Sequence, residues 1–194
     1  MAELNSKKLN LNVGKLRIVK SAALELAESK LADSKKQLLT DFSSHPVTLE
    51  IQGGESSPNI SGTLGGYGNL FSFIGFPASF NPISPITKLI NSIRLIKKSD
   101  KKVDKNGTLF SFRVFAPRIS EFENASPMPW ASGRSWITGI ERGISGLGYF
   151  ISRLGTGRSE GGQQADSKIR ESSFKRASYF TRMYSDFFKR LRGK

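Results

Sequence analysis

Few side chains in the sequence belong to the types that carry out covalent or metal chemistry. It contains no cysteine and one histidine, His45, which excludes thiolate nucleophiles, disulfides and cysteine-containing zinc sites. A serine-type triad would need that single imidazole, and the sequence places no pair of acids to orient it. We therefore interpret His45, which precedes Pro46, as the C-terminal end of a helix, where it interacts with the helix dipole.

Two further patterns resemble chemical sites. Glu121 and Glu123 are paired carboxylates suited to acid–base work or to a metal, but at a spacing of two between prolines they are expected to face solvent. Gly62–Gly68 is as glycine-rich as a phosphate-binding loop, yet it lacks the Gly-Lys-Ser/Thr ending of a Walker motif, and no helix pattern follows it directly. We expect a loop that is flexible or held by a partner. No catalytic, cofactor-binding or metal-binding residue is predicted, and no enzymatic activity.

Charge is the strongest chemical signal in the 194 residues. Lys and Arg number 30 against 16 Asp and Glu, a formal net charge of +14. Residues 151–194 carry 11 basic and 4 acidic side chains, half of that net charge. A charged run is usually a solvated face, but this concentration favours contact with an acidic protein surface or with DNA. The predicted polyanion contacts are Lys97, Lys98, Lys101, Lys102, Arg176, Arg182, Lys189, Arg190 and Arg192.

The first element that positions these residues is a long N-terminal helix. From Gly14 to Ser44, apolar residues recur at steps of three, four or seven and form one stripe, with charged residues around it. The stripe thins between Leu31 and Leu38, which predicts less burial in the C-terminal half. Pro46 ends the pattern, because the residue before a proline disfavours helical geometry. The stripe comprises Leu16, Val19, Ala23, Leu26, Ala27, Leu31, Leu38 and Phe42.

The middle of the chain alternates between strand-like runs and turns. Val47–Ile51 predicts a strand, and the aromatic-rich run Asn69–Phe76 predicts a buried strand. Residues 53–69 form a long glycine-rich loop, of a length that is usually functional or ordered by a partner. A short helix is predicted over about residues 83–93, because prolines precede its apolar spacing.

Residues 92–117 predict an antiparallel hairpin with a lysine-rich tip. Asn106-Gly107 tolerates the positive φ angles of a tight turn. Beyond it, Phe110, Phe112 and Val114 alternate with other residues, which gives the strand one apolar face.

The last part of the chain predicts a turn and two helices. Pro127–Trp130 is a rigid turn, and an apolar pattern from Gly133 to Arg153 predicts a helix that contains several glycines. Each interior glycine costs a helix about 1 kcal/mol relative to alanine, so this helix needs close packing against the sheet or a neighbouring subunit. Residues 155–167 have the composition of a flexible linker, and residues 168–194 predict a basic amphipathic helix.

The aromatic side chains in this part each allow two interpretations. Trp130 and Trp136 are spaced to stack on the bases of a single strand or to pack the turn onto the following helix, and we favour packing. The phenylalanines of the last helix fit a membrane-surface helix or packing on the domain or a neighbour. Packing is favoured, because no second membrane signal accompanies them. They are Phe174, Phe180, Phe187 and Phe188.

Together these elements predict an α+β protein. It has a long N-terminal helix, a small antiparallel or mixed sheet, a packed glycine-rich helix and a C-terminal helical arm. The predicted core domain covers residues 1–154, followed by the linker 155–167 and the helix 168–194. No apolar run reaches the roughly 18 residues of a membrane span, and the N-terminus lacks the apolar segment of a signal peptide. We expect a soluble protein without a membrane partner.

Four segments together resemble uncharacterised virion structural proteins of tailed bacteriophages. They are Asn59–Leu64, Gly68–Phe76, Pro129–Trp136 and Gly139–Tyr149. The build is also similar to minor tail or tail-completion proteins of the phage neck, and the resemblance spans most of residues 10–190. It implies a ring-forming subunit between head connector and tail tube, made in the host cytoplasm and located in the virion. The long glycine loop and the tethered basic helix depart from the small members of this group.

The resemblance implies neighbouring copies, neck, tail and connector proteins and packaged DNA as partners, and no cofactor. The predicted interface residues are Tyr67, Phe71, Trp130, Arg134, Trp136, Gly139, Gly143, Phe180 and Phe187. The alternative function is a nucleic-acid-binding module that uses the basic hairpin tip and the C-terminal helix. The weakest hypothesis is a hydrolase centred on His45.

Overall fold

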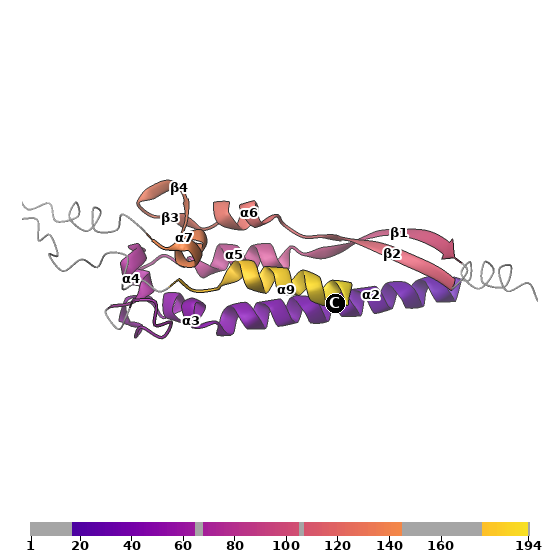
Figure 1. Ribbon diagram of the computed structural model, residues 1–194, viewed down its shortest axis with the longest axis horizontal. Helices are drawn as coiled ribbons and strands as arrows, with labels where there is room; N and C mark the ends of the chain where they lie inside the picture. Colours follow the sequence, from indigo (N-terminus) through magenta and orange to yellow (C-terminus); the bar gives the residue numbers. More distant parts are fainter. Residues whose placement is uncertain (1–16, 65–67, 105–106, 145–175, 194) are drawn as a thin grey trace, which may run out of the picture.

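The computed structural model describes residues 17–64, 68–104, 107–144 and 176–193, with residues 97–104 and 107–108 described as backbone only. Seven α-helices, one 3-10 turn and two antiparallel two-stranded sheets occur within these ranges. They form an elongated body in which helix α2 runs along most of the length (Figure 1). The α+β prediction, with a long N-terminal helix, antiparallel strands and a C-terminal helix, is confirmed.

Helix α2 (Arg17–Ser44) confirms the predicted long helix, but its burial is the reverse of the prediction. Leu38 and Phe42 in the C-terminal half are at most 1% exposed, whereas Ile18 and Leu26 are 77% and 72% exposed. The reason is that α9 (Phe180–Arg192), α3 (Pro46–Gln52) and α5 (Ile83–Asn91) pack around the C-terminal half. Among the described elements, the other half has only the hairpin of strands β1 (Arg94–Asp104) and β2 (Gly107–Phe115) beside it. The density of apolar residues along a stripe therefore does not predict which part is covered.

The two predicted strands before residue 80 are wrong, because both segments are short helices. Helix α3 (Pro46–Gln52) begins with a proline at its first position, and the Nδ1 atom of His45 accepts a hydrogen bond from the Val47 amide at 3.2 Å. Val47 and Ile51 are buried, and Leu49 points outward. Val47 and Ile51 are four residues apart, so they share one face whether the segment is a helix or a strand. The pattern therefore fits both structures, and the cap at the start of the segment favours the helix.

Helix α4 (Leu70–Ile74) is fixed by caps at both ends. The side chain of Asn69 accepts a hydrogen bond from the Ser72 amide at 2.9 Å, and Gly75 ends the helix at a φ of 80°. That left-handed conformation favours glycine, and it satisfies carbonyls that the helix leaves unpaired. The run looked like a strand because three of its residues are aromatic or β-branched, but the caps override that propensity.

The loop between α3 and α4 contains a 3-10 turn, η1 (Gly54–Ser56), and otherwise irregular backbone over the residues that the structure describes. A buried carboxylate holds it in place. The two oxygens of Glu50, a fully buried residue on α3, accept hydrogen bonds from the amides of Ser61 and Leu70 at 2.8 and 2.7 Å. One side chain thus holds both the middle of the loop and its junction with α4.

Helix α5 (Ile83–Asn91) confirms the predicted short helix. Asn81 caps it by accepting hydrogen bonds from two amides of its first turn at 3.1 Å. Its buried residues Ile86 and Ile90 face the core. The Nζ atom of Lys35 on α2 donates to the Asn91 carbonyl at 2.6 Å, which ties the end of α5 to α2.

Strands β1 (Arg94–Asp104) and β2 (Gly107–Phe115) form the predicted hairpin. They pair in antiparallel register from Arg94 opposite Phe115 to Asp104 opposite Gly107, with an irregularity between Ile96 and Ser99. Phe110, Phe112 and Val114 are half-buried and alternate with exposed residues, which confirms the apolar face of β2. We call this hairpin the β-ribbon. It extends beside the N-terminal half of α2 (Figure 1).

A second small unit follows the β-ribbon: helix α6 (Ile119–Asn124), strands β3 (Pro127–Met128) and β4 (Ala131–Ser135), and helix α7 (Trp136–Arg142). The turn between β3 and β4 confirms the predicted turn. The predicted helix Gly133–Arg153 begins too early and is interrupted after Arg142, and its predicted end lies outside the described residues. Gly133 lies in β4 with a φ of 75°, and α7 ends at Gly143 with a φ of 104°, conformations that favour glycine.

Gly139 is the glycine that remains inside α7, and its packing is as close as predicted. A Cβ atom at this position would lie 2.3 Å from the Cε atom of Met128 on β3. The absence of a side chain lets the helix backbone approach this methionine. Gly146, Gly148 and the predicted linker lie outside the described residues.

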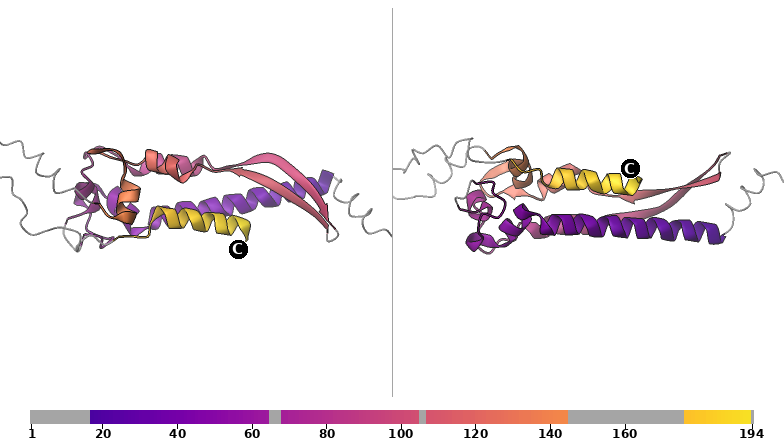
Figure 2. Two further views of the ribbon diagram at one scale, coloured as in Figure 1. Left: turned by 45° about the horizontal axis from the view of Figure 1, so that its top comes forward. Right: turned by 60° about the horizontal axis from the view of Figure 1, so that its bottom comes forward.

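Helix α9 (Phe180–Arg192) begins later than predicted, because residues 176–179 are not helical. It lies antiparallel to α2 along the C-terminal half of that helix (Figures 1 and 2). Phe180 joins the rings of Phe42 and Phe122 at centroid distances of 5.8 and 4.5 Å. The last helix therefore completes the core that the first helix begins.

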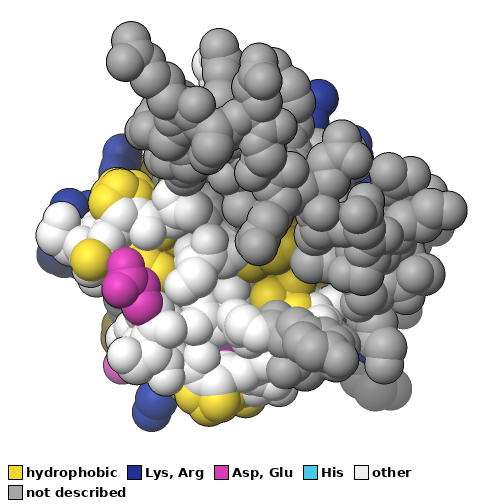
Figure 3. All heavy atoms as spheres, turned by 90° about the vertical axis from the view of Figure 1, so that its left-hand side faces the viewer, with side chains coloured by type: hydrophobic (Ala, Val, Ile, Leu, Met, Phe, Trp, Pro, Cys, Tyr) yellow, Lys and Arg dark blue, Asp and Glu magenta, His cyan; other side chains and the backbone are white. Residues whose placement is uncertain are grey.

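The end of the body opposite the β-ribbon contains α3, α4 and the β3–β4 turn (Figure 1). The indole nitrogen of Trp130 donates to the Ile74 carbonyl at 2.9 Å and joins the turn to α4. Viewed end-on, the described part of this surface shows small hydrophobic areas among backbone and uncharged side chains (Figure 3). Leu49, Ile60 and Phe80 are each between 43% and 49% exposed.

Candidate functional site: helix α9 and its outer face

Helix α9 has two faces of different chemistry. Phe180, Tyr184 and Phe187 are buried and point toward the core. The opposite side holds exposed residues at helical spacing, and at 3.6 residues per turn they share one face. We call this surface the outer face of α9. It consists of Thr181, Arg182, Ser185, Lys189 and Arg192.

The start of α9 is held by a carboxylate from α7. Glu141 accepts hydrogen bonds from the amide and the hydroxyl of Thr181 at 2.7 and 2.6 Å. A negative charge here pairs with backbone amides that lack a helical partner and interacts favourably with the helix dipole. Nearby, the Ala177 amide donates to the Ile140 carbonyl at 3.3 Å. Both oxygens of Glu141 are therefore engaged in holding α9 against α7.

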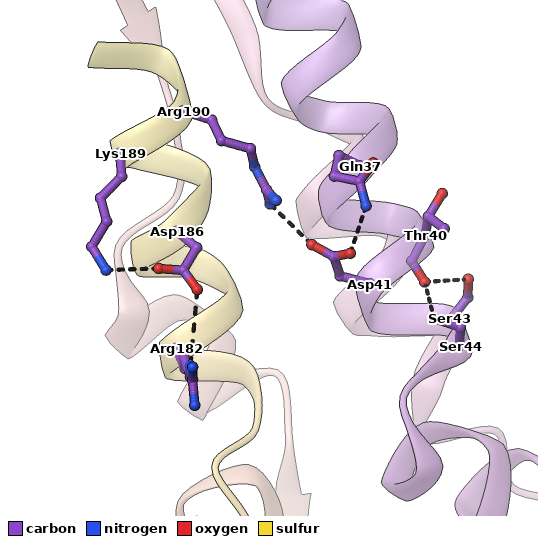
Figure 4. Close-up of polar contacts among 9 residues, drawn as sticks. All are labelled: Gln37, Thr40, Asp41, Ser43, Ser44, Arg182, Asp186, Lys189 and Arg190. Carbon is purple, nitrogen blue, oxygen red and sulfur yellow. Dashed lines mark hydrogen bonds and ion pairs between the residues drawn. The ribbon is translucent and has the colours of Figure 1, made fainter. Parts of the chain in front are cut away.

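The far part of α9 is joined to α2 by an ion pair (Figure 4). The guanidinium of Arg190 contacts Asp41 at 3.0 Å, and the Gln37 amide donates to the other oxygen of Asp41 at 2.7 Å. The Nε atom of Arg190 is buried and has no hydrogen-bond partner within the described ranges. Arg190 was predicted to contact a polyanion, but the structure assigns it to the joint between two helices.

Beside the outer face, the half-buried Asp186 lies between two basic residues of that face (Figure 4). The Lys189 ammonium lies 2.7 Å from one oxygen of Asp186, and the Nε atom of Arg182 lies 4.0 Å from the other. The hydrogen bond from Lys189 is the largest cause that lowers the pKa of Asp186 below its ordinary value. The side chains of Arg182 and Lys189 remain 75% and 62% exposed, so they stay accessible to another anion.

A surface hollow of about 570 Å³ lies beside the first turns of α9. Its lining includes three cations, Arg176, Arg182 and Lys189, and the hydroxyl groups of Ser178 and Ser185. It also includes Glu141, whose carboxylate already accepts the hydrogen bonds from Thr181. Arg176 is exposed and forms no ion pair with any residue that the structure describes. Cations and hydroxyl donors around one hollow are suited to binding an anion with several oxygens.

The β-ribbon is a second candidate surface. Within the described ranges, neither β1 nor β2 pairs with another strand, so each has one open edge. Several apolar side chains of the β-ribbon are exposed, among them Leu109 on β2 at 60% and Ile96 on β1 at 42%. Phe115 is 38% exposed and lies under the guanidinium of Arg94, 4.7 Å from the ring centroid.

Most of the predicted interface residues are buried within this chain. Trp130 is half-buried and bonded to α4, Arg134 is exposed on β4, Gly143 is half-buried, and Tyr67 lies outside the described residues. The remaining residues are buried, because α9 folds back onto α2, α7 packs against β4 and α6, and α4 packs against α3. This correction applies to Phe71, Trp136, Gly139, Phe180 and Phe187.

The predicted polyanion contacts fall into two groups. Lys97, Lys98, Lys101 and Lys102 lie on strand β1, whose side chains at these positions are outside the description. Four others are exposed on or beside α9: Arg176, Arg182, Lys189 and Arg192.

The single histidine has a role other than the predicted one. Its ring caps the start of α3, and it lies 4.9 Å from the ring of Tyr179, so the predicted interaction with the dipole at the end of α2 is wrong. Burial is the largest cause that lowers its pKa, and a hydrogen bond with the Ser178 backbone opposes this shift. His45 therefore joins the α2–α3 corner to the segment before α9.

The two carboxylates that suggested acid–base chemistry do not act as a pair. Glu121 is exposed, as predicted, and accepts a hydrogen bond from the Arg118 amide at the start of α6 at 2.9 Å. Glu123 is half-buried and accepts from the Thr138 hydroxyl on α7 at 3.0 Å. Within the described ranges, no three metal-ligating side chains converge.

Three important residues had no functional assignment from the sequence. Glu50 holds the loop, Asp41 anchors α9, and the buried Tyr179 hydroxyl hydrogen-bonds Thr48 at 2.7 Å. The acid inside the apolar run Val47–Ile51 was the one available signal for Glu50. Nothing local marks Asp41 or Tyr179, because their partners are more than a hundred residues away.

The fold and the two surfaces define a mixed α/β protein with an open β-ribbon and a basic helix face. Comparison with protein-family models, with curated proteins and with solved structures gives no significant match. In the part of the chain that the structure describes, none of the helices combines the length and the apolar character needed to cross a membrane.

Proposed function

We propose that the protein is a structural subunit of a tailed-phage neck or tail, which completes or joins the tail at the head–tail interface through a homo-oligomeric ring. The support is of two kinds. The sequence segments resemble virion structural proteins, and the β-ribbon has the properties of a surface that is completed by a neighbouring copy. The open β-ribbon is the observation that carries the proposal.

A two-stranded hairpin is marginally stable in water without further strands or a covering layer. The β-ribbon has strands of 11 and 9 residues, and its outward residues include exposed Leu109 and Ile96. Open strand edges pair readily with another chain. The two strands differ in charge, because β1 contains four lysines whereas β2 carries a single charged residue, Arg113. Lysines on both sides would oppose pairing of two β1 edges, so pairing of β1 with the β2 edge of another copy is favoured.

In a head-to-tail arrangement of copies, the backbone groups at the open edges of both β1 and β2 find hydrogen-bond partners. If β2 of one copy pairs with β1 of the next, every copy uses one edge of each kind, and the series closes into a ring when the rotation allows it. The exposed Ile18 and Leu26 of α2 lie at the same end of the body and add apolar area to this contact.

The assembly can be tested by measuring the mass of the purified chain in solution over a range of concentrations. The wild type is expected to form a multi-subunit species, and a Leu26→Glu/Leu109→Glu variant is expected to be monomeric. A Leu49→Glu/Phe80→Glu variant is the matched control, because those exposed residues lie away from the β-ribbon. A wild type that stays monomeric, alone and with the head connector, would contradict ring formation.

The location can be tested by electron microscopy of purified virions with an antibody against the chain. Label is expected at the junction of head and tail. Label confined to the capsid shell would rule out a place in the neck.

The second candidate function is a nucleic-acid-binding module. The outer face of α9 and its hollow favour it. The hairpin lysines contribute no structural observation, because their side chains are outside the description.

A further inference from the structure

We propose that the outer face of α9, together with Arg176, binds the phosphate backbone of double-stranded DNA. This inference goes beyond the structural role proposed above. It depends on α9 and its hollow, and it requires neither ring formation nor a particular place in a virion.

The first argument is the geometry of the outer face. Arg182, Ser185, Lys189 and Arg192 follow one another at steps of three and four, so they form a straight row on one side of the helix. The row is about 15 Å long, at 1.5 Å per residue. Backbone contacts in protein–DNA complexes come mainly from such basic and hydroxyl side chains.

The second argument is what the outer face lacks. All its residues are polar or charged, and the large apolar side chains of α9 are turned toward the core or its margin. A protein partner is normally anchored by aromatic or aliphatic side chains at the centre of the contact. A surface of cations and hydroxyls fits phosphates better than it fits an acidic protein.

The third argument separates double-stranded from single-stranded DNA. Proteins that hold single strands stack the bases on exposed aromatic rings. In α9, Phe180, Tyr184 and Phe187 are buried, and Phe188 is half-buried against the core. The outer face therefore has no ring on which a base could stack, and a duplex backbone remains the better ligand.

Asp186 gives the proposal a specific signature. Its carboxylate already contacts Lys189 and Arg182, so it competes with a phosphate for the same two cations. Removing its charge without changing its shape frees both side chains. Asp186→Asn is therefore expected to raise the affinity for DNA severalfold, which a merely structural ion pair on the surface would not do.

The test measures binding of a fluorescent 20-base-pair duplex of arbitrary sequence at several salt concentrations. The wild type is expected to bind, with an affinity that falls steeply as salt rises. The double variant Arg182→Gln/Lys189→Gln is expected to bind on the order of tenfold more weakly, and its salt slope should decrease by about 2, because two phosphate contacts are lost. Arg176→Gln should decrease the slope by about 1.

The matched control is Lys20→Gln/Lys36→Gln, which removes the same charge from exposed positions on α2. It should bind nearly as well as the wild type. A control that loses as much affinity as the α9 variant would overturn the proposal, because binding would then follow net charge alone. The proposal would also fail if wild type did not bind duplex at low salt, if Asp186→Asn bound no better, or if single-stranded DNA or poly-glutamate bound more tightly than duplex.

Discussion

The two halves of helix α2 differ in what covers them. The C-terminal half is enclosed by α9, α3 and α5, and Leu38 is completely buried there. The N-terminal half has the β-ribbon as its neighbour, and Ile18 and Leu26 stay largely exposed. Both halves carry apolar residues at helical spacing. Apolar residues at helical spacing therefore identify the face of a helix that can pack against other apolar residues. Whether that face is buried depends on whether another segment of the chain packs against it.

The largest expected effect tests the enclosed half. Phe180→Ala removes a fully buried ring that contacts Phe42 and Phe122, and it should lower the free energy of unfolding by about 3–5 kcal/mol. Leu26→Ala in the exposed half should change it by no more than about 0.5 kcal/mol. Urea unfolding of both variants measures the difference. Equal losses would remove the distinction between the two halves of α2.

The second largest effect is expected from a buried polar residue on α3, one of the helices that enclose the C-terminal half of α2. Glu50→Gln replaces a buried carboxylate that accepts from two amides with a group that has one acceptor oxygen. We expect a loss of about 1.5–3 kcal/mol, as for hydrogen bonds to a charged group. Hydrogen exchange should also accelerate at the amide of Ser61 or Leu70.

Glu55→Gln is the control for that experiment, because Glu55 is exposed and its carboxylate makes no hydrogen bond or ion pair within the described residues. It should leave both stability and exchange unchanged. An effect as large as that of Glu50→Gln would show that charge alone, and not the two hydrogen bonds, stabilises the loop.

The smallest effect concerns pH. Burial lowers the pKa of His45 below its ordinary value of about 6.5. The unfolded chain therefore takes up a proton before the folded one, and stability that is fully present above about pH 6.5 is lost as the pH falls. His45→Asn keeps a capping side chain without the titration. Between pH 7.5 and 5, its free energy of unfolding should decrease less than that of the wild type, and parallel profiles would contradict this role.

Sequence reasoning reached the elements whose signals are local and unambiguous. The period of α2, the prolines before α5 and the Asn-Gly turn of the β-ribbon each have one physical interpretation. Val47–Ile51 has two, because residues 47 and 51 share a face in a helix and also in a strand. The deciding contact is the His45 ring on the Val47 amide, which depends on a side-chain orientation that composition does not encode.

The candidate site was predictable only in part. The concentration of charge identified Arg182, Lys189 and Arg192 because exposed basic residues repeat along a helix. Arg190 belongs to the same run, but it points at Asp41, whose position beside α9 follows from the tertiary fold. Phe180 and Phe187 were assigned to a contact between subunits, since nothing in the sequence indicates that α9 returns to α2.

The antiparallel contact between α9 and α2 has a consequence for synthesis of the chain. The aromatic residues that contact Phe42 are Tyr179 and Phe180, and the ribosome adds them more than 130 residues after it. At about 5–20 residues per second, roughly 7 to 28 s pass between Phe42 and Phe180. During that interval the nascent apolar surface of α2 is open to chaperones. A product that ends before Tyr179 lacks these contacts, so proteases should cleave the C-terminal half of α2 faster in it than in a chain that contains α9.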